Sequence, residues 1–302
     1  MHSARNWPSQ CSGAHSKCKA PRSARDASFL PTRIVEIGQP EPHKVRLRLS
    51  SDQLDATSGY ATLSHCWGKA KVLKLKSVSF RALRTGIAIA ELGQTFQDAI
   101  FTARSLDISL LWIDSLCIFQ DSKVDWQHES ALMGQVYSNG ILNIAASIAV
   151  DSDASCFPER PSSSLDPYFV QTDWDQFENG TYLLYKRVVW ENTIGGTPLT
   201  KRAWVIQETC LAPRVLYLCG SQIFWQCYDL RACERFPKGA SLVPPTYSVG
   251  SQISHRLDYL EALDSEFWFA RPDTLYEALG NSEELIPIRR LTQDSKHALW
   301  QL

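Results

Sequence analysis

Three short stretches of this sequence bring together the residue types of a small-ligand pocket: hydroxyl, thiol, imidazole, carboxyl and indole groups. The first, SHCWG, spans residues 64–68, and the second, DSLCIFQD, spans residues 114–121. The third, RAWVIQE, spans residues 202–208. If this third stretch is helical, Trp204 and Glu208 share one face, because they are four residues apart.

The polar side chains of these stretches follow predicted strands or lie on a predicted helix. In open α/β sheets the carboxyl ends of the strands form the ligand crevice, so the side chains should meet there. Taken singly, each has a structural explanation as a cap, a satisfied histidine or half of an ion pair. We expect a cluster of Ser64, Trp67, Asp114, Gln120, Arg202 and Glu208, with His65 and Trp204 completing the candidate set.

A cysteine hydrolase is a second chemistry that these residues allow. Cys66 or Cys117 would be the nucleophile, with His65 or His128 as the base and Asp114 as its partner. Neighbouring side chains of a strand point to opposite faces, which disfavours the pairing of His65 with Cys66. The sequence contains no dinucleotide-binding glycine motif, P-loop, nucleophile elbow or H-E-x-x-H zinc motif that would favour a simpler assignment.

The nine cysteines are an odd number, and without a secretory signal they are typical of free thiols. Cys11, His15 and Cys18 offer three metal ligands, but no fourth ligand lies near them in the sequence. A second group lacks the C-x-x-C pair that structural zinc sites usually show. It consists of Cys210, Cys219, Cys227 and Cys233. We therefore expect no metal site in either place.

Apolar periodicity predicts alternating strands and helices. Helical spacing is found at residues 94–107, 125–137 and 201–211, and Thr95 could cap the first of these helices. This order favours an α/β fold, with a parallel-rich sheet flanked by helices and extra β-hairpins. The predicted strands lie at residues 33–37, 45–49, 60–64, 108–114, 141–147, 181–190, 214–219 and 222–227.

Composition and charge exclude several classes of protein. The 302 residues carry 31 Lys and Arg against 32 Asp and Glu, so no basic field exists to hold nucleic acid. The longest apolar run, residues 141–150, is too short to span a membrane, which needs ~20 residues. We expect a cytoplasmic protein with a disordered basic tail over residues 1–28, a domain over residues 29–235 and a helical extension over residues 236–302.

At these stretches the sequence resembles the fungal heterokaryon incompatibility (HET) domain. YATLSHCWG, residues 60–68, looks like the opening motif of that family. Residues 96–147 resemble its long central block, and residues 201–227 resemble its third block, R-x-W-x-x-Q-E followed by a strand and W-x-C. FLPTRIVEI, residues 29–37, looks like the usual lead-in, so the resemblance covers residues 29–227.

The resemblance implies a role in fungal non-self recognition, in which the domain triggers programmed cell death after incompatible hyphae fuse. The family is thought to be distantly related to TIR domains, which implies a TIR-like or Rossmann-like sheet. WVIQE, residues 204–208, is similar to the W-x-x-x-E stretch of TIR enzymes that cleave NAD, where the Glu is catalytic. By this analogy Glu208 and Asp114 are the catalytic residues, the other six candidates bind substrate, and NAD is a substrate rather than a cofactor.

A non-enzymatic role is the alternative. The domain would signal by assembly, through self-association or a fungal incompatibility partner, and its motifs would only build the core. A pocket faced by Glu208 and Asp114 favours the enzyme, whereas a buried, ion-paired Glu208 with no cavity favours the assembly module.

Overall fold

The computed structural model divides the chain into two compact units. The first comprises residues 1–165 and 192–237, and the second comprises residues 166–191 and 238–302. The described residues are 2–19, 29–38, 43–52, 54, 59–69, 72–160, 168–172, 180–186, 189–239 and 267–270.

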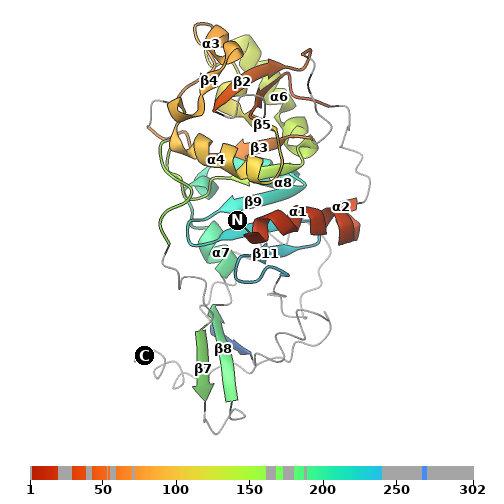
Figure 1. The fold of residues 1–302 in the computed structure, drawn as a ribbon, viewed down its shortest axis with the longest axis vertical. Helices are drawn as coiled ribbons and strands as arrows, with labels where there is room; N and C mark the ends of the chain where they lie inside the picture. Colours follow the sequence, from red (N-terminus) through yellow and green to blue (C-terminus); the bar gives the residue numbers. More distant parts are fainter. Residues whose placement is uncertain are drawn as a thin grey trace. The chain divides into compact units, whose positions relative to one another are not determined.

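The first unit is built on a nine-stranded mixed sheet with the order β11-β10-β9-β6-β3-β5-β1-β2-β4 (Figure 1). Strands β9, β6, β3 and β5 run parallel to one another at its centre, and antiparallel strands extend it at both edges. The predicted α/β fold with a parallel-rich sheet and added hairpins is confirmed. The strands are β1 (Arg33–Glu36), β2 (Lys44–Leu49), β3 (Ala61–Ser64), β4 (Ile87–Ala88), β5 (Leu110–Ile113), β6 (Leu142–Ala145), β9 (Arg214–Leu218), β10 (Ile223–Cys227) and β11 (Arg231–Cys233).

Helices connect the parallel strands, with α4 before β5, α6 before β6 and α8 before β9. The connections from β3 to β5 and from β5 to β6 run in opposite directions along the sheet. Because such crossovers are right-handed, they lie on opposite faces, and ligands bind open α/β sheets at a reversal of this kind. Between β2 and β9 this unit contains the helices α3 (Phe80–Thr85), α4 (Gln94–Ser105), α5 (Asp114–Cys117), α6 (Lys123–Asn139) and α8 (Ala203–Leu211), with short 3-10 turns at Ile89–Glu91 and Leu199–Lys201.

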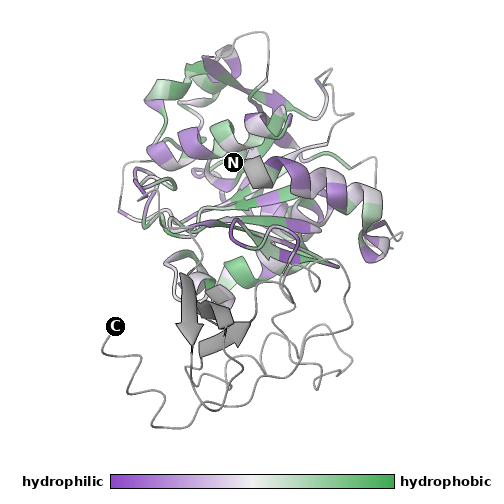
Figure 2. Ribbon diagram, turned by 60° about the horizontal axis from the view of Figure 1, so that its bottom comes forward, coloured by the Kyte–Doolittle hydropathy of each residue, from purple (hydrophilic) through white to green (hydrophobic). Residues whose placement is uncertain are grey.

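The core lies on both faces of the central strands. Every residue of β3, β5 and β6 is buried, as expected for parallel strands that are covered on two sides. On α4 the buried positions include Phe96, Ala99, Ile100 and Ala103, which recur at helical spacing. Figure 2 shows hydrophobic residues concentrated along the strands, whereas the helices alternate between hydrophobic and hydrophilic residues.

The second unit contains a three-stranded antiparallel sheet with the order β12-β8-β7. Its strands are β7 (Tyr168–Thr172), β8 (Gly180–Lys186) and β12 (Phe267–Ala270). Helix α7 (Val189–Ile194) begins where the sequence pattern continued a strand to residue 190. The helical extension expected over residues 236–302 falls largely outside the described residues, but residues 267–270 form β12 and not a helix, because they pair with β8.

The beginning of the chain is folded, although its composition led us to expect a disordered tail over residues 1–28. Residues 2–19 form α1 (His2–Ala14) and α2 (Ser16–Lys19). The ring of Trp7 is 1% exposed, stacks on Trp225 with the centroids 6.1 Å apart, and donates from Nε1 to the carbonyl of Pro237 at 2.7 Å. Composition misses this packing because the partners lie more than two hundred residues away in the sequence.

The start of α4 also differs in detail from the expectation. Gly93 is its N-cap, so Thr95 lies inside the first turn and does not cap the helix. Its hydroxyl instead donates to the carbonyls of Asp151 at 2.9 Å and Ala154 at 2.6 Å, which ties α4 to the loop after β6.

Candidate functional site

The carboxyl ends of two neighbouring parallel strands supply the first part of the candidate site. Ser64 is the last residue of β3, and Asp114 directly follows β5, which pairs with β3. Glu208 comes from α8, and its carboxyl group interacts with both Ser64 and Asp114. The structure thus brings together three residues that lie far apart in the sequence, as the strand-end argument predicted.

Trp67 and Gln120 hold the Asp114 segment in place. Nε1 of Trp67 donates to Oδ2 of Asp114 at 2.9 Å, and the amide of Ser115 donates to Oδ1 at 2.6 Å. Nε2 of Gln120 donates to the carbonyls of Ile118 at 2.8 Å and Asp114 at 3.4 Å, so it supports the backbone of this turn.

Gly68 makes the turn after Trp67 sterically feasible. Its φ is +58°, in the left-handed region that favours glycine. A Cβ at this position would lie 2.2 Å from Cβ of Asp151. The close approach of these two loops therefore requires glycine here.

A row of buried polar side chains lies beneath the carboxyl groups, and the sequence reasoning did not assign it to the site. Asn143 on β6 donates from Nδ2 to Oγ of Ser64 at 3.0 Å, and its Oδ1 accepts from Thr62 at 3.1 Å. All three residues are buried. The available signal was an asparagine inside an otherwise apolar strand, because a buried polar group needs partners.

Tyr137 is the second residue that sequence reasoning did not assign to the site. It is buried near the end of α6, interacts with Ser64 and Glu208, and packs edge-on against Trp112 with the centroids 5.7 Å apart. Burial raises the pKa of its hydroxyl well above the usual value, and the nearby Glu208 adds to the rise. Tyr137 is therefore a neutral hydrogen-bonding group at neutral pH.

The carboxyl groups of Glu208 and Asp114 both have raised pKa values. Burial raises the pKa of Glu208, interactions with Ser64, Arg202 and Tyr137 oppose the rise, and the charge of Asp114 adds to it. Burial likewise raises the pKa of Asp114, against the hydrogen bond from Trp67 and the charge of Arg202. Oε2 of Glu208 is buried and has no hydrogen-bond partner among the described residues. Such a pair of coupled carboxyl groups is suited to holding or sharing a proton.

His65 and Arg202 also lie near Asp114. Burial, reinforced by the charge of Arg202, lowers the pKa of His65 to about 3, so its ring is neutral. Nδ1 of His65 lies 3.8 Å from Oδ1 of Asp114, and the ring packs edge-on against Phe96 with the centroids 5.0 Å apart. The guanidinium of Arg202 donates to the carbonyl of His65, which fixes the start of α8 beside the end of β3.

Trp204 differs from the other candidates because it points into solvent. It is 57% exposed, whereas Glu208, one helical turn later, is 4% exposed. The expected shared face of these two residues therefore does not place the indole inside the carboxyl cluster.

The burial of the two candidate thiols argues against the cysteine hydrolase. Burial raises the pKa of Cys66, and it raises the pKa of Cys117 to about 12. Both groups are therefore thiols at neutral pH, whereas a cysteine nucleophile must be a thiolate.

Comparison with known proteins identifies the part of the chain that carries this site. No curated protein and no solved structure matches the chain. None of the helices that the structure describes has the length and apolar character needed to cross a membrane. A model of the family described as Heterokaryon incompatibility protein (HET) matches residues 60–208, a range that contains all eight candidate residues. Residues 60–208 of the chain are therefore a HET domain, the domain of the heterokaryon incompatibility family.

Proposed function

We propose that this HET domain is a cell-death effector of fungal non-self recognition, and that it acts by hydrolysing the bond between nicotinamide and ribose in NAD. The domain carries the heterokaryon incompatibility function of its family, and its carboxyl cluster would supply the chemistry. The observation that carries the proposal is Glu208: a buried carboxyl group beside Asp114 with an oxygen that has no hydrogen-bond partner among the described residues.

The chemistry suits a carboxylate at this position. When the bond breaks, nicotinamide leaves with the electron pair and the ribose carbon develops positive charge, as in glycoside hydrolysis. Water then adds to that carbon and releases a proton, which gives ADP-ribose. The nicotinamide ring of NAD is itself cationic, so its arrival favours the ionised form of Glu208 over the neutral form that burial favours.

The surrounding residues would position the substrate and the two acids. Trp67 is half-buried beside Asp114 and offers an indole for stacking, with Nζ of Lys74 at 4.6 Å from its ring centroid. Ser64 and Tyr137 would orient the carboxyl group of Glu208, with which both interact. Arg202 would complement the diphosphate charge of the substrate from the start of α8.

The test is nicotinamide release from NAD by the purified chain, measured by chromatography. Glu208→Gln keeps the shape and removes the charge, so it should reduce the rate by on the order of 100-fold or more, as for the loss of a preorganised electrostatic contact. Glu159→Gln is the matched control, because Glu159 is exposed. Equal nicotinamide release by wild type and Glu208→Gln would exclude catalysis by this residue.

A signalling module that acts by assembly is the second candidate, and exposed apolar side chains of α8 favour it. Trp204 is 57% exposed and Ile206 is 64% exposed, which leaves two large apolar side chains of this short helix in contact with solvent. A second copy of the chain would cover such a surface. Cell killing is measured for Glu208→Gln and Ile206→Asp, and self-association of both variants is measured by light scattering. If Glu208→Gln still kills cells, whereas Ile206→Asp loses both self-association and cell killing, assembly is the function and hydrolysis is not.

A further inference from the structure

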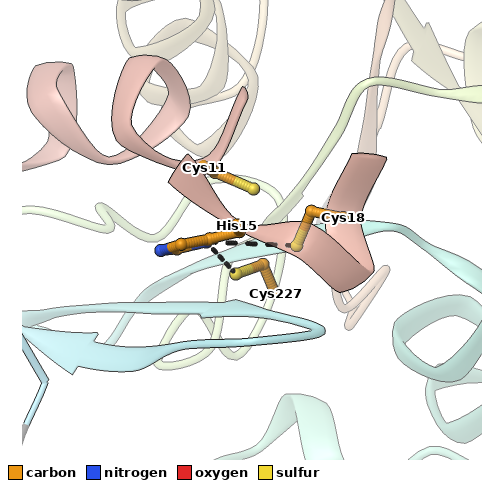
Figure 3. A group of neighbouring side chains, drawn as sticks. All are labelled: Cys11, His15, Cys18 and Cys227. Atoms are coloured by element: carbon orange, nitrogen blue, oxygen red, sulfur yellow. Dashed lines mark hydrogen bonds between the residues drawn. The ribbon is translucent and has the colours of Figure 1, made fainter. Parts of the chain in front are cut away.

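Four metal-binding side chains meet in a second cluster, separate from the carboxyl site. Cys11 lies on α1, His15 lies between α1 and α2, Cys18 lies on α2 and Cys227 is the last residue of β10. Figure 3 shows their side chains pointing toward one another. The four candidate ligand atoms all lie within 4.8 Å of one another. Nδ1 of His15 is 3.3 Å from Sγ of Cys227 and 4.0 Å from Sγ of Cys18.

We propose that these four side chains bind one Zn²⁺ ion in a tetrahedral site with three cysteines and one histidine. Tetrahedral zinc has Zn–S bonds of about 2.3 Å and Zn–N bonds of about 2.0–2.1 Å, so its sulfur ligands lie about 3.8 Å apart. The observed separations are within about 1 Å of this geometry, a gap that small side-chain rotations close. Thiolate and imidazole ligands select zinc over magnesium or calcium, which prefer oxygen.

Sequence spacing explains how the first three ligands converge. Cys11 precedes His15 by four residues and Cys18 follows it by three, so the three ligands lie close to one another around the break between α1 and α2. The fourth ligand, Cys227, lies 212 residues after His15. No local pattern in the sequence indicates this pairing, so the zinc proposal replaces our expectation that no metal site exists here.

Neighbouring residues suit a negatively charged zinc site. Zinc binding displaces one proton from each of three thiols, which leaves a net charge of −1 on the ion, three thiolates and neutral imidazole. Nε of Arg214 donates to Sγ of Cys11 at 3.1 Å and offsets this charge. The side chain of Asp229 accepts from the amide of Lys17 at 2.8 Å, which holds α2 next to the end of β10. Such outer contacts orient the ligands of metal sites.

The site would attach the beginning of the chain to β10 of the main sheet. Helix α2 has only four residues and α1 contains Pro8, so neither is stable as an isolated helix. Stacking of Trp7 on Trp225 supplies one attachment of α1 to β10. A zinc ion bound by Cys11, His15, Cys18 and Cys227 would supply a second one. The role is structural and independent of the NAD proposal.

Metal analysis of the full-length protein, purified without chelators, tests the site. Elemental analysis should find one zinc per chain. Cobalt-exchanged protein should show the visible bands of tetrahedral Co²⁺ together with sulfur-to-cobalt charge transfer. Cys18→Ser and Cys227→Ser should each lower the zinc content at least 10-fold, whereas Cys210→Ser, at an exposed cysteine outside the cluster, should retain it.

His15→Cys keeps the proposal falsifiable if Cys227→Ser fails to fold. This variant should still bind one zinc, and its cobalt spectrum should shift to that of a four-thiolate site. The proposal is overturned if wild type lacks stoichiometric zinc and the cobalt spectrum. It is also overturned if Cys18→Ser or His15→Cys changes neither measurement, or if the non-reduced protein contains a disulfide between two of the three cysteines.

Discussion

The indole of Trp67 donates a hydrogen bond to Oδ2 of Asp114 at 2.9 Å and so connects the loop after β3 to the end of β5. This hydrogen bond lowers the pKa of Asp114, whereas burial raises it. The hydrogen bond therefore joins an aromatic residue of the first motif to an acid of the second, and loss of the donor should change the pKa of that acid.

Trp67→Phe should raise the pKa of Asp114 further, because the ring remains while the donor to the carboxylate is lost. A ¹³C NMR titration of the Asp114 carboxyl group measures this directly. Trp126→Phe, at a half-exposed tryptophan on α6, is the control and should leave the titration unchanged. An unaltered midpoint in Trp67→Phe would show that the indole does not stabilise the charged form.

Glu208→Gln should stabilise the fold at neutral pH, in addition to its expected effect on the proposed NAD hydrolysis. The folded-state pKa of Glu208 is raised, so the native state binds more protons than the unfolded state, and stability falls as pH rises from the unfolded pKa through the folded one. Glutamine does not titrate and escapes this loss, which is ~1.4 kcal/mol for each unit by which the pKa is raised.

Thermal unfolding at several pH values measures the effect of Glu208→Gln. At pH 7 the melting temperature of the variant should exceed that of wild type by ~2–4 °C for each kcal/mol of added stability. This difference should decrease at pH values below the usual pKa range of glutamate. Glu159→Gln, at an exposed glutamate, is the matched control. A constant difference at all pH values would contradict a raised pKa at Glu208.

Arg33→Met should destabilise the domain by about 3–5 kcal/mol, because it leaves buried charge without a partner. Nη2 of Arg33 lies 2.7 Å from Oδ2 of Asp125 and 3.2 Å from Oε1 of Glu129, which is 2% exposed. Urea unfolding measures the loss, with Arg81→Met at an exposed arginine of α3 as the control. Equal urea midpoints for Arg33→Met and Arg81→Met would mean that the buried ion pairs do not contribute to the free energy of unfolding.

Trp204→Ala should cost less than about 1 kcal/mol of stability, because the side chain is 57% exposed. Trp112→Ala should cost about 3–5 kcal/mol, because Trp112 is completely buried in β5. The folded Trp204→Ala variant therefore isolates the function of the ring, and a selective rise in KM for NAD would assign it to substrate binding. A melting temperature lowered as much as by Trp112→Ala would contradict the observed exposure.

Removal of zinc should lower the melting temperature of the full chain by on the order of 10 °C. A ligand at a thousandfold excess over its dissociation constant stabilises the folded state by about 4 kcal/mol, and each kcal/mol corresponds to about 2–4 °C. Calorimetry with and without a high-affinity chelator measures the shift. Cys18→Ser should melt at the same temperature in both conditions, and a chelator effect on that variant would point to a different metal site.

Local patterns in the sequence were sufficient for most elements of the first unit. The apolar runs at residues 60–64, 108–114 and 141–147 correspond to three parallel strands of the sheet, because strands covered on both faces must be apolar throughout. Ser64 and Asp114 were predicted as site residues because they are polar and lie at the carboxyl ends of such strands, where open α/β sheets bind ligands.

The tertiary structure decided which of these residues meet and in what environment. Trp204 and Glu208 look equivalent along a helix, but only packing against α6 and the strand ends determines that one is exposed and the other buried. Tyr137 and Asn143 belong to the site because a buried polar group requires a hydrogen-bond partner, and their partners lie on other elements.

The sequence by itself determined the α/β fold, the family motifs and the three neighbouring ligands of the N-terminal helices, because each depends on spacing within one segment. The folded beginning of the chain and the fourth ligand, Cys227, were decided only by the tertiary structure. Contacts across more than two hundred residues depend on where the chain returns in space, which local periodicity does not encode.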